Sequence, residues 1–132
     1  MATFSHQIKV RGFHCDMFQH VNNARYLEFL EETRWEWLNR MTSFEFFEKH
    51  QMSFVVVSIT IHYRWPSLLN DVLNITVETN HIGNRSASVK QVITRDGDSK
   101  LIAEAEVTFA MIDNRTGKSV PISDELKAFF EN

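Results

Sequence analysis

Residues that interrupt or cross-link a chain are scarce in this sequence of 132 residues, which has two prolines, four glycines and one cysteine. The lone Cys15 excludes an internal disulfide framework, and without a Cys-x-x-Cys pair there is no typical cysteine zinc site. We also find no linker or low-complexity tract, while 43% of the residues are hydrophobic, enough to build a core. We therefore expect a single domain over residues 1–132.

Long apolar runs and a basic leader are also missing. Residues 54–57 are among the longest purely apolar runs, whereas a membrane-spanning helix needs about 20 residues. The amino terminus shows no basic region followed by an apolar stretch, the pattern of a secretory signal. We therefore expect a cytoplasmic protein without a membrane span, which also suits a chain with one cysteine.

Strong charge of one sign is absent as well. Lys and Arg number 14 against 17 Asp and Glu, a formal net charge of -3, so bulk electrostatics gives no reason to expect nucleic acid as a partner. No glycine-rich phosphate loop is present, which argues against a kinase or a nicotinamide-dependent enzyme. The six histidines form no His-x-His or His-x-x-x-His pair, and we expect neither a metal nor a cofactor.

The segments that are present predict an α+β fold. Five of them have the period or composition of strands: residues 7–13, 53–64, 71–81, 86–95 and 101–113. The second, rich in Val and Ile without a helical period, is expected to be buried on much of both faces. A short helix or aromatic loop is expected over 42–52 and a terminal helix over 123–130. An antiparallel β-sheet wrapped around one long helix would bury the Ala-rich face at Ala103 and Ala105.

The long helix is predicted over residues 27–41, where one stripe recurs at helical spacing. That stripe is expected to face the core: Tyr26, Leu27, Leu30, Arg34, Trp35, Leu38 and Met41. Asn22 or Asn23 is a suitable N-cap, because its amide oxygen can accept a hydrogen bond from a backbone N–H of the first turn.

Polar groups that can do chemistry stand just before this helix. Free N–H groups at the helix start would stabilise a substrate oxygen that becomes anionic, and Asp16 would stand close by as a base or nucleophile. Alternatively, Asp16, His20 and Asn22 only satisfy a turn and cap the helix, and the residue pattern alone favours this second explanation. A nucleophilic Cys15 beside His14 is a weaker alternative, since neighbouring side chains diverge.

A resemblance to a known family favours the catalytic explanation of these residues. Residues 16–26 read Asp-Met-Phe-Gln-His-Val-Asn-Asn-Ala-Arg-Tyr and residues 27–35 read Leu-Glu-Phe-Leu-Glu-Glu-Thr-Arg-Trp. Together they resemble the signature of the 4-hydroxybenzoyl-CoA thioesterase family of hotdog-fold proteins, and in particular its long-chain acyl-CoA thioesterases. Two flanking stretches support the likeness: Ile-Lys-Val-Arg-Gly-Phe-His at 8–14 and Phe-Val-Val-Val-Ser-Ile-Thr-Ile-His-Tyr-Arg-Trp-Pro at 54–66.

The resemblance implies a hotdog fold, a homodimer or homotetramer, and a site at the start of the long helix shared by two subunits. Asp16 matches the catalytic carboxylate of the family. The backbone N–H groups around Val21, Asn22 and Asn23 would be oxyanion donors. His20 and Asn22 lie in the same motif, and holding the turn, orienting water and positioning the substrate are open roles for them. Tyr26 is expected in the core or an interface.

We therefore expect an acyl-CoA thioesterase that hydrolyses medium-to-long-chain fatty acyl-CoA to free fatty acid and CoA. The first alternative is a thioesterase for aromatic or other small acyl-CoA, and the second is a non-catalytic hotdog module that binds acyl-CoA. An aromatic run at Phe44, Phe46 and Phe47 is interpreted as satellite core packing, or else as a wall for an apolar ligand tail.

Overall fold

The computed structural model describes residues 3–41 and 44–131, and it is the α+β fold that the sequence predicts. The strands are β1 (Phe4–Lys9), β2 (Met52–Tyr63), β3 (Val72–Ile82), β4 (Ser86–Arg95) and β5 (Leu101–Asp113). The helical elements are η1 (Gly12–His14), α1 (Asn23–Met41), α2 (Phe44–His50) and α3 (Asp124–Glu131). The side chains of Met41 and Phe44, assigned above to the helix stripe and the aromatic run, lie outside the described part, as do Thr42 and Ser43.

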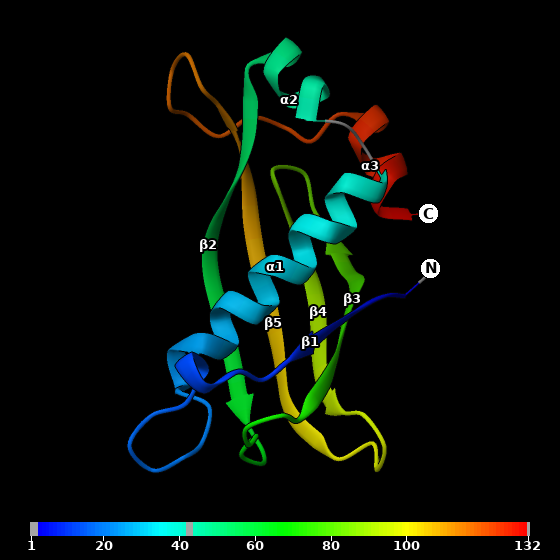
Figure 1. Ribbon diagram of the computed structural model, residues 1–132. Coiled ribbons are helices and arrows are strands. Elements are labelled where there is room, and N and C mark those ends of the chain that lie inside the picture. The colour runs from blue at the N-terminus through cyan, green and yellow to red at the C-terminus, as the bar shows by residue number, and fades with distance from the viewer. Residues whose placement is uncertain (1–2, 42–43, 132) are drawn as a thin grey trace.

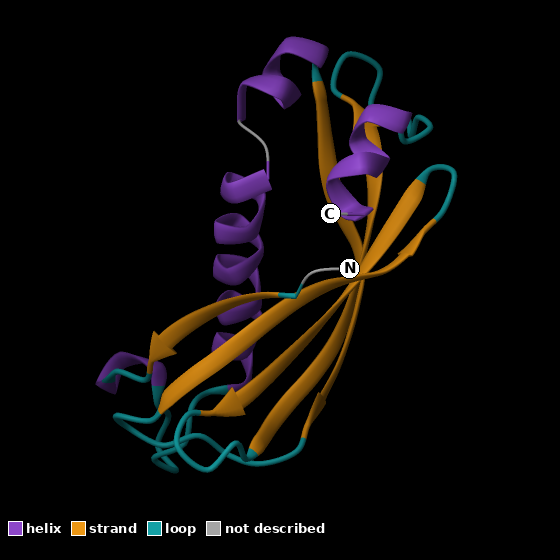
Figure 2. Ribbon diagram, turned by 90° about the vertical axis from the view of Figure 1, so that its right-hand side faces the viewer, coloured by secondary structure: helices purple, strands orange, loops and turns teal. Residues whose placement is uncertain are grey.

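One antiparallel sheet contains all the strands, in the order β1-β3-β4-β5-β2, and it curls around α1 (Figures 1 and 2). Helix α1 lies on one face of the sheet and crosses it diagonally. Its first turn lies beside the end of β2, and its last turn lies near α3 (Figure 1). Among the described helices, none is both long and apolar enough to cross a membrane.

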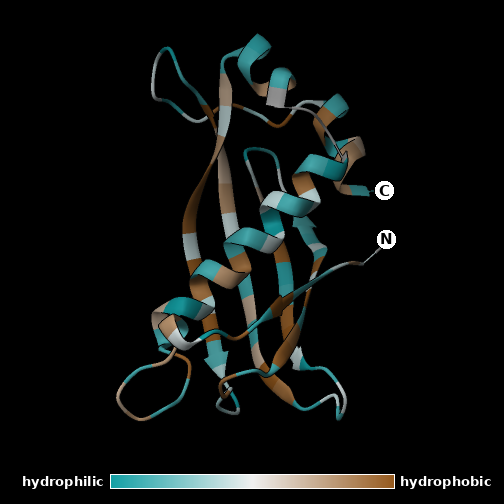
Figure 3. Cartoon of the chain, viewed as in Figure 1, coloured by the Kyte–Doolittle hydropathy of each residue, from teal (hydrophilic) through white to brown (hydrophobic). Residues whose placement is uncertain are grey.

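Strand β5 contributes to the buried inner face of the sheet. Its inward residues alternate with polar ones, as Figure 3 shows by colour, and Ala103 and Ala105 belong to the same buried cluster as Tyr26, Phe29 and Leu30. The small alanines leave room for the larger side chains of this cluster. The predicted inward face of residues 101–113 is confirmed.

The buried stripe of α1 differs in part from the prediction. Tyr26 and Leu30 are buried as expected, but Leu27 and Trp35 are 37% and 44% exposed, so their placement in the core is wrong for the single chain. The additional buried residues of the helix are Phe29, Thr33 and Trp37. Helix α1 packs mainly on β3 and β1, whereas Trp35 lines a cleft with Met52, Phe54 and Val56 of the edge strand β2.

The first strand begins earlier than predicted and is shorter. It ends at Lys9, because the next residue leaves the ladder with β3 and makes two contacts with a loop: the Val10 N–H donates to the Asp71 carbonyl and the Asn70 N–H donates to the Val10 carbonyl, at 2.9 and 3.0 Å. Residues 12–14 then form η1 rather than the end of a strand.

Strand β2 corrects the expectation of burial on both faces. It is an edge strand that pairs with β5 alone, and its valine-rich run is open to solvent in the single chain. Val55, Val57 and Ile59 are 45%, 60% and 37% exposed. The strand also has a register shift between Val56 and Ser58, the position of a β-bulge. Its apolar composition therefore reflects an uncovered edge, not a central position.

The two short helices close one end of the molecule. In α2, Phe46 and Phe47 pack against the core, with ring centroids 5.9 Å from Phe129 and 5.6 Å from Phe54, which confirms the satellite packing. Helix α3 begins after Ser123, whose hydroxyl oxygen accepts a hydrogen bond from the third N–H of the helix at 3.3 Å, so Ser123 acts as its N-cap.

Candidate active site

The polar stretch before α1 folds into a tight hairpin loop with Asp16 at its base. The Asp16 N–H donates to the His20 carbonyl and the Gln19 N–H donates to the Asp16 carbonyl, both at 2.9 Å. Gln19 adopts a left-handed conformation with φ of 66°, which lets the chain reverse. The Asp16 side chain is exposed, and its Oδ1 accepts the Phe18 N–H at 2.9 Å. One carboxylate oxygen is thus used by the loop, and the side chain remains accessible.

Asn22 is the N-cap of α1. Its Oδ1 accepts the Ala24 N–H and its carbonyl accepts the Arg25 N–H, both at 2.9 Å. Of the two asparagines that the sequence offered for this role, the structure therefore selects Asn22. Asn23 is the first residue of the helix.

The three backbone N–H groups expected as oxyanion donors differ in availability. The Val21 N–H donates to the Ser67 carbonyl and the Asn22 N–H donates to the His14 carbonyl, both at 2.9 Å. Within the described residues, the Asn23 N–H has no such partner. This group stands at the positive end of the helix dipole, so it is the N–H in this set best able to receive an anionic oxygen.

Two tyrosines fix the surroundings of the helix start. The Tyr63 hydroxyl donates to the Asn23 carbonyl at 3.1 Å, which joins the end of β2 to the first residue of α1. The Tyr26 hydroxyl accepts the N–H of buried Ser67 at 3.1 Å. Burial raises the pKa of Tyr26, so this phenol stays protonated. Tyr26 is a core residue, as predicted.

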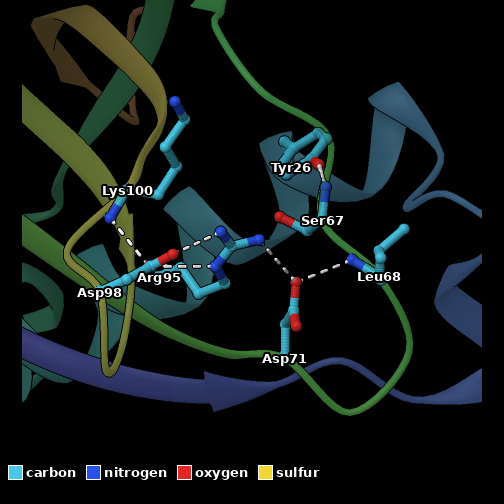
Figure 4. A network of polar contacts seen from close by, with 7 residues as sticks. All are labelled: Tyr26, Ser67, Leu68, Asp71, Arg95, Asp98 and Lys100. Carbon is cyan, nitrogen blue, oxygen red and sulfur yellow. Dashed lines mark hydrogen bonds and ion pairs between the residues drawn. The ribbon is translucent and has the colours of Figure 1, made fainter.

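A second set of polar contacts holds the loop that carries Ser67 (Figure 4). Asp71 Oδ2 accepts the Leu68 N–H at 2.9 Å and lies 3.8 Å from Arg95 Nη1. Arg95 Nε also donates to Asp98 Oδ1 at 3.1 Å, and this interaction lowers the pKa of Asp98 to about 2. Because the Ser67 carbonyl receives the Val21 N–H, these contacts also fix the loop before α1.

His14 and Cys15 have separate partners and do not form a thiol–imidazole pair. The His14 Nδ1 accepts the Arg11 N–H at 2.8 Å, while the Cys15 Sγ lies 3.8 Å from the Arg11 carbonyl oxygen. Partial burial, followed by the charge of Arg25, lowers the pKa of His14. These contacts give no support to a cysteine nucleophile.

The sequence did not predict a partly buried polar pair between the helix and the sheet. Gln91 is fully buried, and its amide links the two layers: Nε2 donates to the Leu30 carbonyl at 3.1 Å and Oε1 accepts from Arg34 Nη1 at 3.0 Å. The signal available in the sequence was a polar residue at an inward position of the strand, between Val89 and Ile93.

The site therefore has an accessible carboxylate in the loop before α1 and a free backbone N–H at the first residue of that helix, around which the sheet wraps. This arrangement suits acyl transfer, in which a nucleophile attacks a carbonyl whose oxygen becomes anionic. The chain belongs to the thioesterase-like superfamily, whose family model matches residues 10–130.

Similar sequences and a similar crystal structure support membership of this superfamily. The chain is 46% identical over 125 residues to the long-chain acyl-CoA thioesterase FadM of Escherichia coli, covering 95% of each chain. It is 29% identical over 131 residues to the acyl-CoA thioesterase YbgC of Haemophilus influenzae, covering 98% of this chain and 95% of that one. The crystal structure of the probable thioesterase YbaW from Escherichia coli superposes with a TM-score of 0.89 at 46% identity, covering 96% of both chains.

Proposed function

We propose that this protein hydrolyses acyl-CoA thioesters to a free acid and coenzyme A, with Asp16 as the base or nucleophile. The observation that carries the proposal is the free Asn23 N–H at the start of α1, directly after the loop that holds the exposed Asp16. Membership of the thioesterase-like superfamily and the similarity to two acyl-CoA thioesterases support it.

In this mechanism Asp16 either attacks the thioester carbonyl or takes a proton from the water that attacks it. A carbon–oxygen bond forms while the carbonyl oxygen becomes anionic, and the Asn23 N–H and the helix dipole stabilise that charge. The carbon–sulfur bond then breaks, and the CoA thiolate leaves and takes up a proton. If Asp16 attacks directly, water hydrolyses the resulting anhydride and releases the acid.

The remaining residues of the loop act as positioning residues. Asn22 caps the helix, and Val21 is tied to Ser67, so the Asn23 N–H is held in a fixed direction. The His20 carbonyl accepts the Asp16 N–H, which fixes the backbone of the carboxylate. We assign His20 and Asn22 to this role.

The substrate class we propose is medium-to-long-chain fatty acyl-CoA. The 46% identity to a long-chain acyl-CoA thioesterase supports this choice. So does the aromatic lining of a cleft between α1 and β2, which offers apolar surface to an alkyl chain.

We also propose that the protein acts as a homodimer paired along β2. An unpaired edge strand with exposed valines is an association surface, and the adjacent side of α1 exposes Leu27 and Trp35. A two-fold pairing of β2 with a second copy would extend the sheet and cover both surfaces.

Thiol release from a panel of acyl-CoA substrates tests the proposed function. Hexanoyl-, lauroyl-, palmitoyl- and benzoyl-CoA are incubated with the protein, and free CoA is measured with a thiol reagent. We expect turnover that rises with chain length. The highest turnover on benzoyl-CoA would favour a thioesterase for small aromatic acyl groups. Binding of every substrate without CoA release would favour a non-catalytic binding module.

A further inference from the structure

The connection between β2 and β3 contacts the start of α1 on both sides of Trp65. Before Trp65, the Tyr63 hydroxyl donates to the Asn23 carbonyl at 3.1 Å. After it, the Ser67 carbonyl accepts the Val21 N–H at 2.9 Å. Trp65 is two residues from each of these contacts, so its Cα lies within about 7 Å of theirs. This connection, the loop before α1 and the β4–β5 turn lie at one end of the molecule (Figure 1). Trp65 is therefore a neighbour of the reacting groups that the proposed mechanism does not use.

The backbone of Trp65 is fixed to the sheet beside a lysine. The N–H groups of Arg64 and Trp65 both donate to the Ile102 carbonyl, at 2.8 and 3.1 Å. Lys100 lies two residues before Ile102, and its Nζ lies over the Trp65 ring, 4.2 Å from the centroid. The negative face of the indole attracts this cation. Because Trp65 is 48% exposed, part of a flat aromatic surface next to a positive charge stays open.

The charge of Lys100 is not neutralised by a neighbouring carboxylate. Two other cations at this end form ion pairs: Arg64 Nη2 lies 2.9 Å from Glu104 Oε1, and Arg95 Nη2 contacts Asp98 Oδ2. No carboxylate in residues 3–41 or 44–131 forms an ion pair with Lys100. Asp98 accepts only its backbone N–H, and Figure 4 shows the Lys100 side chain pointing away from that carboxylate. The ammonium group is thus available to an anionic ligand.

An open indole surface beside such an ammonium group suits a nucleotide. A base stacks on an aromatic ring because every base has a π face, and a lysine attracts phosphate groups. A fatty acyl chain would use the apolar surface but not the charge, and a small inorganic anion would use the charge but not the ring. Coenzyme A carries an adenine base and phosphate groups, which its pantetheine arm joins to the sulfur of the thioester.

We propose that Trp65 and Lys100 bind the nucleotide end of the CoA thioester, with adenine stacked on the indole and a phosphate group near Lys100 Nζ. The inference rests on the proposed thioesterase function and adds to it the residues that distinguish CoA thioesters from thioesters without a nucleotide. Both side chains contact a part of the substrate that does not react, so they stabilise the bound substrate and the transition state equally. Their loss should therefore raise KM and leave kcat nearly unchanged.

Two thioesters with the same acyl group separate nucleotide binding from chemistry: lauroyl-CoA and lauroyl-N-acetylcysteamine, which has no nucleotide. Trp65→Leu removes the aromatic ring and keeps an apolar side chain. We expect its KM for lauroyl-CoA to rise at least about five-fold, with kcat/KM for lauroyl-N-acetylcysteamine at the wild-type value. Trp65→Phe keeps a ring and should retain most of the affinity. Equal effects of Trp65→Leu on the two thioesters, or no effect on either, would overturn the assignment.

Leu69→Ala controls for a general disturbance of the connection between β2 and β3. Leu69 belongs to the same connection and is 53% exposed, so its truncation should change KM for lauroyl-CoA by no more than about two-fold. A rise in KM as large as that of Trp65→Leu would show that the loop, and not the indole, determines CoA binding, and it would overturn the proposal.

Lys100→Gln tests the phosphate contact, with Lys90→Gln as the matched control. Lys90 is an exposed lysine of β4 that lies opposite Glu106 of β5. We expect Lys100→Gln to raise KM for lauroyl-CoA by about three-fold and to weaken its increase with salt concentration, because salt screens a contact between opposite charges. Lys90→Gln should keep the wild-type values. An unchanged KM and salt response in Lys100→Gln would overturn the phosphate contact.

Binding of free CoA separates failure of this inference from failure of the proposed function. Calorimetry should show at least about five-fold weaker binding of CoA to Trp65→Leu than to the wild type, whether or not the wild type hydrolyses lauroyl-CoA. This difference in a wild type that releases no CoA from lauroyl-CoA would retain the nucleotide site and end the thioesterase proposal. Equal affinities in a wild type that hydrolyses lauroyl-CoA would end the nucleotide site alone.

Discussion

The Tyr63 hydroxyl donates a hydrogen bond to the Asn23 carbonyl oxygen at 3.1 Å, and the N–H of the same Asn23 has no partner among the described residues. The start of α1 is therefore anchored from the side of β2 through the Asn23 carbonyl, while the N–H of the same residue is left without a partner.

Removal of the Asn23 N–H is the sharpest test of the oxyanion donor. Asn23→Pro deletes this N–H, and proline is well accommodated at the first position of a helix because its φ is already helical. Asn22 before it is an N-cap, where extended backbone is normal, so the fold should persist. We expect kcat to fall about 10²- to 10³-fold, measured by thiol release.

Asn23→Ala is the control for this substitution, since alanine keeps the N–H and removes only the side chain. Its kcat should stay within about ten-fold of the wild-type value. A folded Asn23→Pro protein with the kcat of Asn23→Ala would exclude the Asn23 N–H from the mechanism.

Loss of the Tyr26 hydroxyl should destabilise the protein more than loss of the Tyr63 hydroxyl. Tyr26→Phe leaves the N–H of fully buried Ser67 without its partner, which costs about 1–3 kcal/mol of unfolding free energy. Tyr63→Phe exposes the Asn23 carbonyl to water, which replaces the bond at a cost of about 1 kcal/mol or less. Urea unfolding measures the free energy of unfolding of both variants. Equal losses of this free energy would contradict the difference in burial between the two hydrogen bonds.

His14 should make stability depend on pH. Its pKa is lowered from 6.5 in the folded protein, so the unfolded chain binds the proton more readily. Its contribution to stability is present above pH 6.5 and declines as the pH falls through the lowered value. Between about pH 7.5 and about pH 5.5, the wild type should therefore lose more stability than His14→Asn, whose amide oxygen can still accept the Arg11 N–H. Equal losses of stability in the two proteins would exclude His14 as a source of this pH dependence.

A charge in the β2 edge should separate the proposed dimer. Ile59 is 37% exposed and lies on the helix-facing side of the strand, opposite Val107. Ile59→Lys would place an ammonium group in the apolar interface, so sedimentation should show a monomer for this variant and a dimer for the wild type. Thr60→Lys, which alters the other face, is the comparison. A monomeric wild type would contradict the proposed pairing.

Much of the fold could be predicted because local patterns determine it. The alternation along β5 identified the inward alanines, and the asparagines before α1 identified its start, since both signals arise from neighbours in the chain. The strand β2 was misinterpreted because a valine-rich edge and a buried central strand have the same composition.

The parts of the site that were not predicted depend on contacts between distant segments. Nothing near Val21 indicates that its N–H is taken by Ser67, and nothing near Arg34 indicates that Gln91 holds it. Such pairs form only after the sheet and helix come together. The sequence could therefore indicate a candidate loop but could not tell which N–H group near it remains free.

The most direct test of the central claim is kcat for Asp16→Asn on palmitoyl-CoA, beside the wild type and the exposed control Asp124→Asn. Asparagine keeps the Oδ1 that accepts the Phe18 N–H, so the loop, the melting temperature and the oligomeric state should be unchanged. We predict a loss of at least about 100-fold for Asp16→Asn and wild-type turnover for Asp124→Asn. Near-normal turnover in a folded Asp16→Asn protein would contradict the account.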